Sequence, residues 1–180
     1  MKAAVDGETN TLLHVGKVFC VGTKEVAVRR GNRPAEITLS PKNAVRKLHF
    51  RIAPDYVDDI ADMSVRMTGI VPSVRLIDGS DAGETAGEIL AVARSEAGGL
   101  HAADMSVFGW RGPNIVSVAV VHSDGGTETT VPQDIGEQLA QLPDEGGTVD
   151  LTLVLPDGGE IVLTVTVEAW ESGSGSGTVI

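Results

Sequence analysis

Apolar and polar residues alternate with a period of two along much of this chain, and this pattern constrains the fold more than any other feature. In "VRKLHFRI", Leu48, Phe50 and Ile52 fall on one face, and charged residues and His49 fall on the other. Such alternation is typical of strands that bury one face. Across the chain, seven residues at such apolar positions form the predicted core: Leu48, Phe50, Val65, Leu151, Leu153, Leu163 and Val165.

The strongest local prediction is a β-hairpin near the end of the chain. Two alternating runs, 149–155 and 161–167, flank the sequence "PDGGE". Pro156 fixes its own φ, and Gly158 or Gly159 supplies the positive φ that a tight turn requires. The two runs are therefore expected to pair as antiparallel strands.

Further short strands are separated by segments rich in Gly, Pro, Asn and Asp, which predict turns. The expected additional strands are Leu12–Val21, Glu25–Arg30, Glu36–Leu39, Val74–Ile77, Ala103–Phe108, Ile115–His122 and Thr127–Val131. About ten short strands indicate an all-β fold, a sandwich or a barrel, of about 8–10 strands.

Helical spacing is confined to at most one or two short segments. In "PQDIGEQLAQL", Ile135, Leu139 and Leu142 lie on one side of a helix. A short helix is also compatible with "PDYVDDIAD". Neither segment is long enough to cover a sheet.

Composition and charge restrict the class of function. The 180 residues are 42% hydrophobic and 22% charged, which is typical of a globular protein. A net charge of −11 repels nucleic acid and anionic lipid. No run of 18 apolar residues is present, so the sequence predicts no transmembrane segment. We expect a flexible N-terminal segment over 1–11, a β-sandwich domain over 12–171 and a Gly/Ser-rich C-terminal tail over 172–180.

The cellular compartment is left open by the sequence start and the single cysteine. Residues 1–10 lack the basic and apolar segments of a signal peptide. This fits a cytosolic protein, or an exported protein without its targeting segment. Cys20 has no partner for an internal disulfide, and its apolar context in "GKVFCVG" predicts a buried thiol. A lipid-modified cysteine is normally preceded by a small residue. Here Phe19 precedes Cys20, so Cys20 is not expected to carry a lipid.

A search for catalytic patterns predicts that this chain is not an enzyme. The four histidines are dispersed, and no HExxH, GxSxG or phosphate-binding glycine loop occurs. His49 is interpreted as a solvated side chain on the polar face of its strand. We therefore assign no catalytic residue, no cofactor-binding residue, no metal ligand and no cofactor.

An alternative function is a soluble glycan- or calcium-binding β-sandwich module. "DGSDAGE" offers Asp78, Asp81 and Glu84 for calcium, but Ile89 occupies the twelfth position, where an EF-hand requires a bidentate Glu. A solvated acidic loop is the favoured interpretation there, as it is for the carboxylates of "DYVDDIAD". For a glycan, Trp110 begins a loop and would have to be exposed, whereas Trp170 is expected to cap the core.

The chain ends in "VEAWESGSGSGTVI", where a strand reaches Trp170 and continues into a low-complexity Gly/Ser segment. This tail is interpreted either as a frayed terminus or as a spare strand able to pair with another sheet edge.

The order of motifs resembles one family of surface proteins. "ITLSPKNAVRKLHFRI" is followed by "DDIADMSVRMTGIVPSVRLIDG", then by "FGW", "VSVAVVHSDGG", "VPQDIGEQLAQL" and "VEAWESG". Over roughly Leu12 to Gly173, this sequence resembles the C-terminal domain of fimbrillin-like, fimbrium-anchor-like proteins of Bacteroidetes.

The resemblance implies a transthyretin-like Greek-key β-sandwich. It also implies a non-enzymatic structural protein at the cell surface, outer membrane or fimbrium: a fimbrial (pilus) subunit, tip or anchor component that takes part in adhesion. Family members usually carry two such domains behind a lipoprotein signal. The implied partners are other fimbrial subunits, bound by β-strand addition, and a host or bacterial surface ligand.

Overall fold

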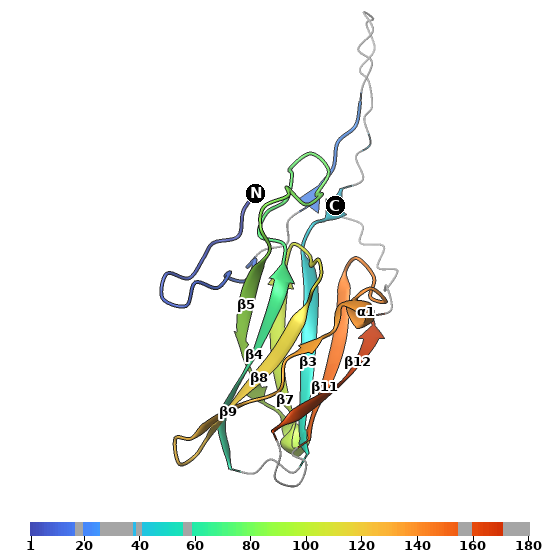
Figure 1. Ribbon diagram of the computed structural model, residues 1–180. Coiled ribbons are helices and arrows are strands. Elements are labelled where there is room, and N and C mark those ends of the chain that lie inside the picture. The colour runs from blue at the N-terminus through green and yellow to red at the C-terminus, as the bar shows by residue number, and fades with distance from the viewer. Residues whose placement is uncertain (17–19, 26–37, 39–40, 56–58, 155–159, 171–180) are drawn as a thin grey trace, which may run out of the picture.

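The computed structural model describes residues 1–16, 20–25, 38, 41–55, 59–154 and 160–170. Two β-sheets pack face to face and form an all-β sandwich, as the alternating pattern predicts (Figure 1). The first sheet has the order β10-β8-β4-β5, and β9 also pairs with β8. Its strands are β4 (Ile60–Ile70), β5 (Gly87–Val92), β8 (Ile115–His122), β9 (Thr127–Thr129) and β10 (Gln133–Asp134).

The second sheet has the order β12-β11-β3-β7-β6. Its strands are β3 (Arg46–Asp55), β6 (Arg94–Ser95), β7 (His101–Val107), β11 (Gly146–Val154) and β12 (Val162–Ala169). A separate two-stranded pair consists of β1 (Cys20–Val21) and β2 (Lys42–Asn43). The 3-10 turn η1 spans Ala97–Gly99, and the single helical turn α1 spans Gly136–Leu139.

The hydrophobic core lies between the two sheets and is built from the alternating positions. Phe50, Ile52 and Leu153 are fully buried from the second sheet, and Val65 and Met67 are fully buried from the first. Of the seven predicted core residues, six are buried and Val165 is half-buried against the same cluster. The apolar period therefore identified the inward face of each of these strands correctly.

The predicted C-terminal hairpin is confirmed as an antiparallel pair of β11 and β12, with Leu151 opposite Val165 and Leu153 opposite Leu163. Most of its turn, residues 155–159, lies outside the described residues. The other side of β11 pairs in parallel with β3, so Val149 lies opposite Phe50. A strand late in the chain thereby becomes the neighbour of an early one.

The predicted strands agree with the structure to different degrees. Strand β8 has the predicted bounds, and β7 and β9 overlap their predicted ranges. Residues 74–77 were predicted as a strand, which is wrong: Val74 forms an isolated bridge with Asp81, and a turn follows at residues 76–78. The predictions over 25–30 and 36–39 lie almost wholly outside the described residues.

The N-terminal part of the predicted strand 12–21 and the whole of β5 also differ from expectation. Leu12 makes a single parallel bridge to Ile89, and only Cys20–Val21 is a strand among the described residues of that range. Strand β5 was not predicted, because "ILAVA" is apolar on both faces. Its Ile89 and Ala91 face the core, while Val92 is 68% exposed.

The segment "PQDIGEQLAQL" is only partly helical. It begins with β10 and continues with the one turn of α1, and Ile135 and Leu139 are buried on the predicted side. The helix considered over 54–62 is wrong for its described residues, since Pro54 and Asp55 end β3 and Ile60 begins β4. No helix in the part of the chain that the structure describes is long and apolar enough to cross a membrane.

The prediction of a buried Cys20 is wrong. Cys20 is exposed, because in β1 it is the neighbouring Val21 that turns inward and is 5% exposed. With only two residues in the strand, one faces solvent and the apolar context does not identify which.

Candidate interaction surfaces

Residues 1–16 lie along the edge of the first sheet, next to β5 (Figure 1). The Leu12 N–H donates to the Glu88 carbonyl at 2.7 Å, and the Ala3 N–H donates to the Pro72 carbonyl at 2.7 Å. Val5 bridges to Leu12, so the segment folds back on itself. The boundary between a terminal segment and the domain, placed at residue 12 from the sequence, stays a prediction.

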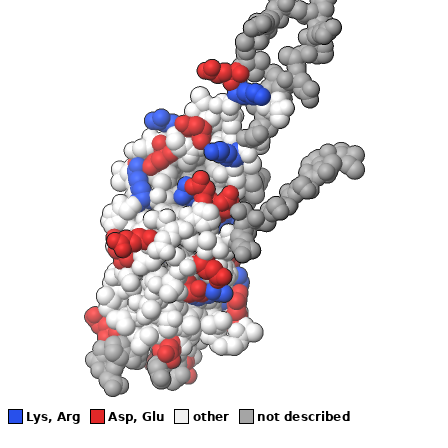
Figure 2. Space-filling model, turned by 90° about the vertical axis from the view of Figure 1, so that its right-hand side faces the viewer, with Lys and Arg blue, Asp and Glu red and all other residues white. Residues whose placement is uncertain are grey.

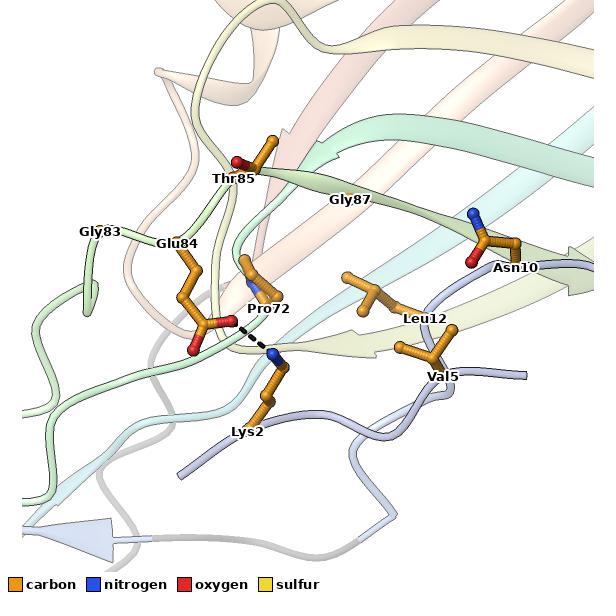
Figure 3. Close-up of a pocket in the computed structure, with 9 residues that line it drawn as sticks. All are labelled: Lys2, Val5, Asn10, Leu12, Pro72, Gly83, Glu84, Thr85 and Gly87. Carbon is orange, nitrogen blue, oxygen red and sulfur yellow. Dashed lines mark ion pairs between the residues drawn. The ribbon is translucent and has the colours of Figure 1, made fainter. Parts of the chain in front are cut away.

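Between this segment and the chain leading into β5 lies a hollow of about 580 Å³, which we call the edge groove (Figure 3). Val5, Leu12 and Pro72 point into it and form an apolar floor. At one end, the Lys2 ammonium and the Glu84 carboxylate pair across 2.7 Å. Its lining residues are Lys2, Val5, Asn10, Leu12, Pro72, Gly83, Glu84, Thr85 and Gly87.

The chemistry of the edge groove suits binding. The hydrogen bond from Lys2 lowers the pKa of the Glu84 carboxyl, so this group is an anion at neutral pH. An apolar floor beside an extended backbone can accept an apolar side chain of an extended peptide. The groove was not predicted from the sequence, because Val5 lies in the segment 1–11 that was expected to be flexible and Leu12 was expected to begin a strand.

The acidic loop "DGSDAGE" holds its carboxylates apart. The Asp81 carboxylate pairs with the Arg111 guanidinium, and Glu84 pairs with Lys2. The Asp78 carboxylate accepts hydrogen bonds from the backbone and hydroxyl of Ser80 and so closes a turn. Over the described residues, no three His, Cys, Asp or Glu side chains gather in a way that could hold a metal ion. The interpretation as a solvated loop thus fits better than a calcium site.

Trp110, the tryptophan considered for a sugar site, does not offer a free stacking face. Trp110 is half-buried against the core, and the Arg46 guanidinium lies over its ring at 5.0 Å. The core-capping role predicted for Trp170 is wrong. Its indole N–H donates to the Thr148 hydroxyl at 2.9 Å, and the residue remains 39% exposed.

On its solvent side the second sheet carries ion pairs that cross its strands. Arg51 donates to both carboxylate oxygens of Asp150, at 2.6 and 2.8 Å, and to Glu168 at 3.2 Å. His49, interpreted as solvated, is on the polar face as predicted but lies 2.7 Å from the Asp104 carboxylate. Asp104 also accepts from Arg94 at 2.6 Å. Figure 2 shows acidic and basic side chains interleaved over the side of the molecule that it faces.

These contacts predict a loss of stability in acid. Burial opposes ionisation of Asp104, but hydrogen bonds from His49 and Arg94 outweigh it, and its pKa is lowered from 3.8. The pKa of Asp78 is lowered as well, mainly by the Ser80 N–H. A lowered folded pKa gives stability that is present above the unfolded value and lost as pH falls through the folded value. The unfolding free energy should therefore decline below about pH 4.

Urea titrations from pH 7 to pH 2.5 measure this decline. Replacing Asp104 by Asn should remove part of the slope below pH 4 and, because the site is exposed, should cost no more than about 1 kcal/mol at pH 7. An identical slope in the variant would mean that Asp104 does not contribute to the acid sensitivity.

A scan against protein-family models finds no match, and a search of curated proteins finds no similar sequence. The solved structures, by contrast, include similar folds. The fimbrial anchor protein Mfa2 from Porphyromonas gingivalis matches 73% of this chain with a TM-score of 0.50 and 10% identity. A candidate adhesin from Bacteroides ovatus matches 96% with a TM-score of 0.55 and 11% identity.

The chain has the fold of these fimbrial and adhesin proteins. A second candidate adhesin from Bacteroides ovatus matches 92% of the chain with a TM-score of 0.52 and 11% identity. The fold expected from the resemblance to fimbrillin-like proteins is thereby confirmed as a β-sandwich. The chain spans about half the length of Mfa2, 49%, and 72% and 65% of the two candidate adhesins.

Proposed function

We propose that this chain is a non-enzymatic structural component of the bacterial cell surface. Its role would be that of a fimbrial subunit, tip or anchor component that takes part in adhesion. The observation that carries the proposal is the fold shared with a fimbrial anchor protein and with candidate adhesins over 73–96% of the chain.

The arrangement of the described side chains supports a structural role. The carboxylates of the acidic loop pair with Arg111 and Lys2, and those on the second sheet pair with Arg51 and Arg94. These pairs are exposed, so each contributes little to the free energy of unfolding, but they link neighbouring strands and loops across the surface. The glycan- or calcium-binding alternative loses its two supports, because Trp110 is covered and the loop carboxylates do not converge.

We further propose that other fimbrial components bind by adding a β-strand to this sandwich. Sheet edges expose backbone donors and acceptors. An added strand forms hydrogen bonds with these groups, and the bonds supply the affinity. Export to the cell surface, lipoprotein anchoring at the outer membrane and the transthyretin-like Greek-key classification are parts of the same proposal and follow from the family resemblance.

Deleting the gene in the bacterium that encodes it tests this role. We expect the mutant to carry fewer or detached filaments in negative-stain electron micrographs and to adhere less to surfaces. Complementation with the full chain should restore both properties. A second complementation with a chain lacking 173–180, which lie outside the described residues, tests whether the tail takes part in assembly. Unchanged filaments and unchanged adhesion in the deletion mutant would contradict the proposal.

A further inference from the structure

Strand β12 leaves one side of the second sheet open. Among the described residues it pairs with β11 alone, and in Figure 1 it lies at the right-hand margin of the sandwich. It is eight residues long, whereas β6, at the opposite edge of this sheet, has two. Residues 1–16 lie beside β5, the edge of the other sheet. Near β12, Val131 bonds to Ile161, the residue before the strand, and α1 lies close to the strand, but no backbone hydrogen bond from the described residues occupies the open side of Val162–Ala169 itself.

The sequence of β12 lacks the features that usually protect an edge. Natural edge strands carry Lys, Pro or a bulge that prevents pairing with another chain. From Val162 to Val167 every residue of β12 is Val, Leu or Thr, and its register with β11 runs without a bulge. Val162 is 38% exposed, and Val165 and Val167 are only half-buried against the core. A neighbouring strand would cover these valines.

The free backbone groups of β12 can be assigned to particular residues. The Ile161 carbonyl accepts a hydrogen bond from the Val131 N–H at 2.9 Å, so it points away from β11. The N–H and C=O of one residue point to the same side of an antiparallel strand, and the side alternates along the chain. Leu163, Val165 and Val167 therefore direct their N–H and C=O groups to the open side.

We propose that this edge binds β12 of a second copy of the chain, antiparallel and around a two-fold axis at Val165. Val165 then faces its own equivalent, and Leu163 faces Val167 of the second copy. In an antiparallel ladder each such pair exchanges two hydrogen bonds. The two sheets join into one continuous sheet across the axis. This inference does not depend on the fimbrial role.

Charge and side-chain pairing favour the antiparallel two-fold arrangement. Glu168 is the only charged residue of β12, and it faces the uncharged Val162 of the second copy. In a parallel arrangement the two copies of Glu168 would lie side by side and repel each other. On the solvent face, Thr164 faces Thr166 of the second copy, and facing threonines stabilise a strand pair. Two copies of the β12 edge can therefore pair with each other.

Sedimentation velocity on the full chain tests the dimer. An interface made by one strand edge is small, so the dimer should be weak and its fraction should rise between about 10 and 500 µM. Replacing Thr164 by Glu places like charges beside Glu168 of the second copy, and we expect at least a tenfold weaker dimer. The matched control is Thr127→Glu on the exposed strand β9, which should leave the dimer unchanged. A monomer at all concentrations, or equal effects of the two variants, would overturn the proposal.

Cysteine cross-linking tests the register in a Cys20→Ser background. Residues 164 and 166 of different copies form a facing pair that is not hydrogen-bonded, with Cα atoms about 4.5 Å apart, which is within disulfide reach. A mixture of Thr164→Cys and Thr166→Cys chains should form a disulfide-linked dimer under mild oxidation severalfold faster than either variant alone. Equal rates in the mixture and in the single variants would contradict this register.

Discussion

Replacing Leu153 by Ala should lower the free energy of unfolding by about 2–5 kcal/mol. Leu153 has no exposed surface and lies in β11, which is paired on both sides, with β3 and with the edge strand β12. The shorter side chain removes apolar contacts from both sheets and leaves a cavity that the rigid sandwich fills only in part. Urea denaturation followed by circular dichroism measures the change.

The matched control is Leu76→Ala. Leu76 is 62% exposed in the turn after Val74, so the same truncation should change stability by less than about 0.5 kcal/mol. A loss below 2 kcal/mol at Leu153, or losses of equal size at both positions, would show that the inward face of β11 is misassigned.

Replacing Gly146 by Ala should destabilise the fold to a similar extent, by about 3–5 kcal/mol. Gly146 begins β11 at a φ of 108°, in a region that favours glycine. A Cβ atom there would lie 1.7 Å from the Lys47 carbonyl oxygen of β3, and backbone cannot move aside as a side chain can. The substitution should therefore disturb the start of the parallel β3–β11 pairing, which joins the early and late halves of the chain.

Gly125→Ala separates the backbone strain from the close contact. Gly125 has a φ of 88° in the exposed turn between β8 and β9, and a Cβ there would meet no atom within 4 Å. The strain alone should cost about 1–2 kcal/mol. If thermal unfolding gives the same loss for Gly125→Ala and Gly146→Ala, close packing of β11 on β3 is not what requires glycine at position 146.

The sequence predicts the inward faces of the strands much better than it predicts their partners. Period-two alternation identified the core positions of β3, β4, β11 and β12, because each strand buries one face. The parallel pairing of β3 with β11 left no local trace, since it joins segments about 100 residues apart. The requirement for glycine at position 146 also arises from a distant part of the chain, because it is the backbone of Lys47 that approaches Gly146.

Where alternation is interrupted, prediction from sequence failed for physical reasons. Strand β5 was missed because Leu90 and Val92 make its outward face apolar as well. Residues 74–77 look like a strand, but a hydrogen bond from the Gly79 N–H to the Arg75 carbonyl closes a turn there and exposes Leu76 and Ile77.

The edge groove shows a further limit of reading the sequence. Lys2 and Glu84 are 82 positions apart, and although Glu84 belongs to the acidic loop "DGSDAGE", nothing in the sequence pairs it with Lys2. The groove exists because residues 1–16 lie along β5, which involves backbone hydrogen bonds that any sequence could make. The family resemblance, in contrast, rested on the order of many soft motifs, and the sandwich fold that it implied is the fold observed.

We propose above all that the molecule works outside the cell as a structural part of the bacterial surface. Immunogold labelling of intact and lysed cells, with antibodies against the purified chain, tests it most directly. We expect gold particles on the surface or along filaments of intact cells, and their loss after brief protease treatment that leaves a cytoplasmic marker untouched. Labelling that appears only after lysis would contradict the claim.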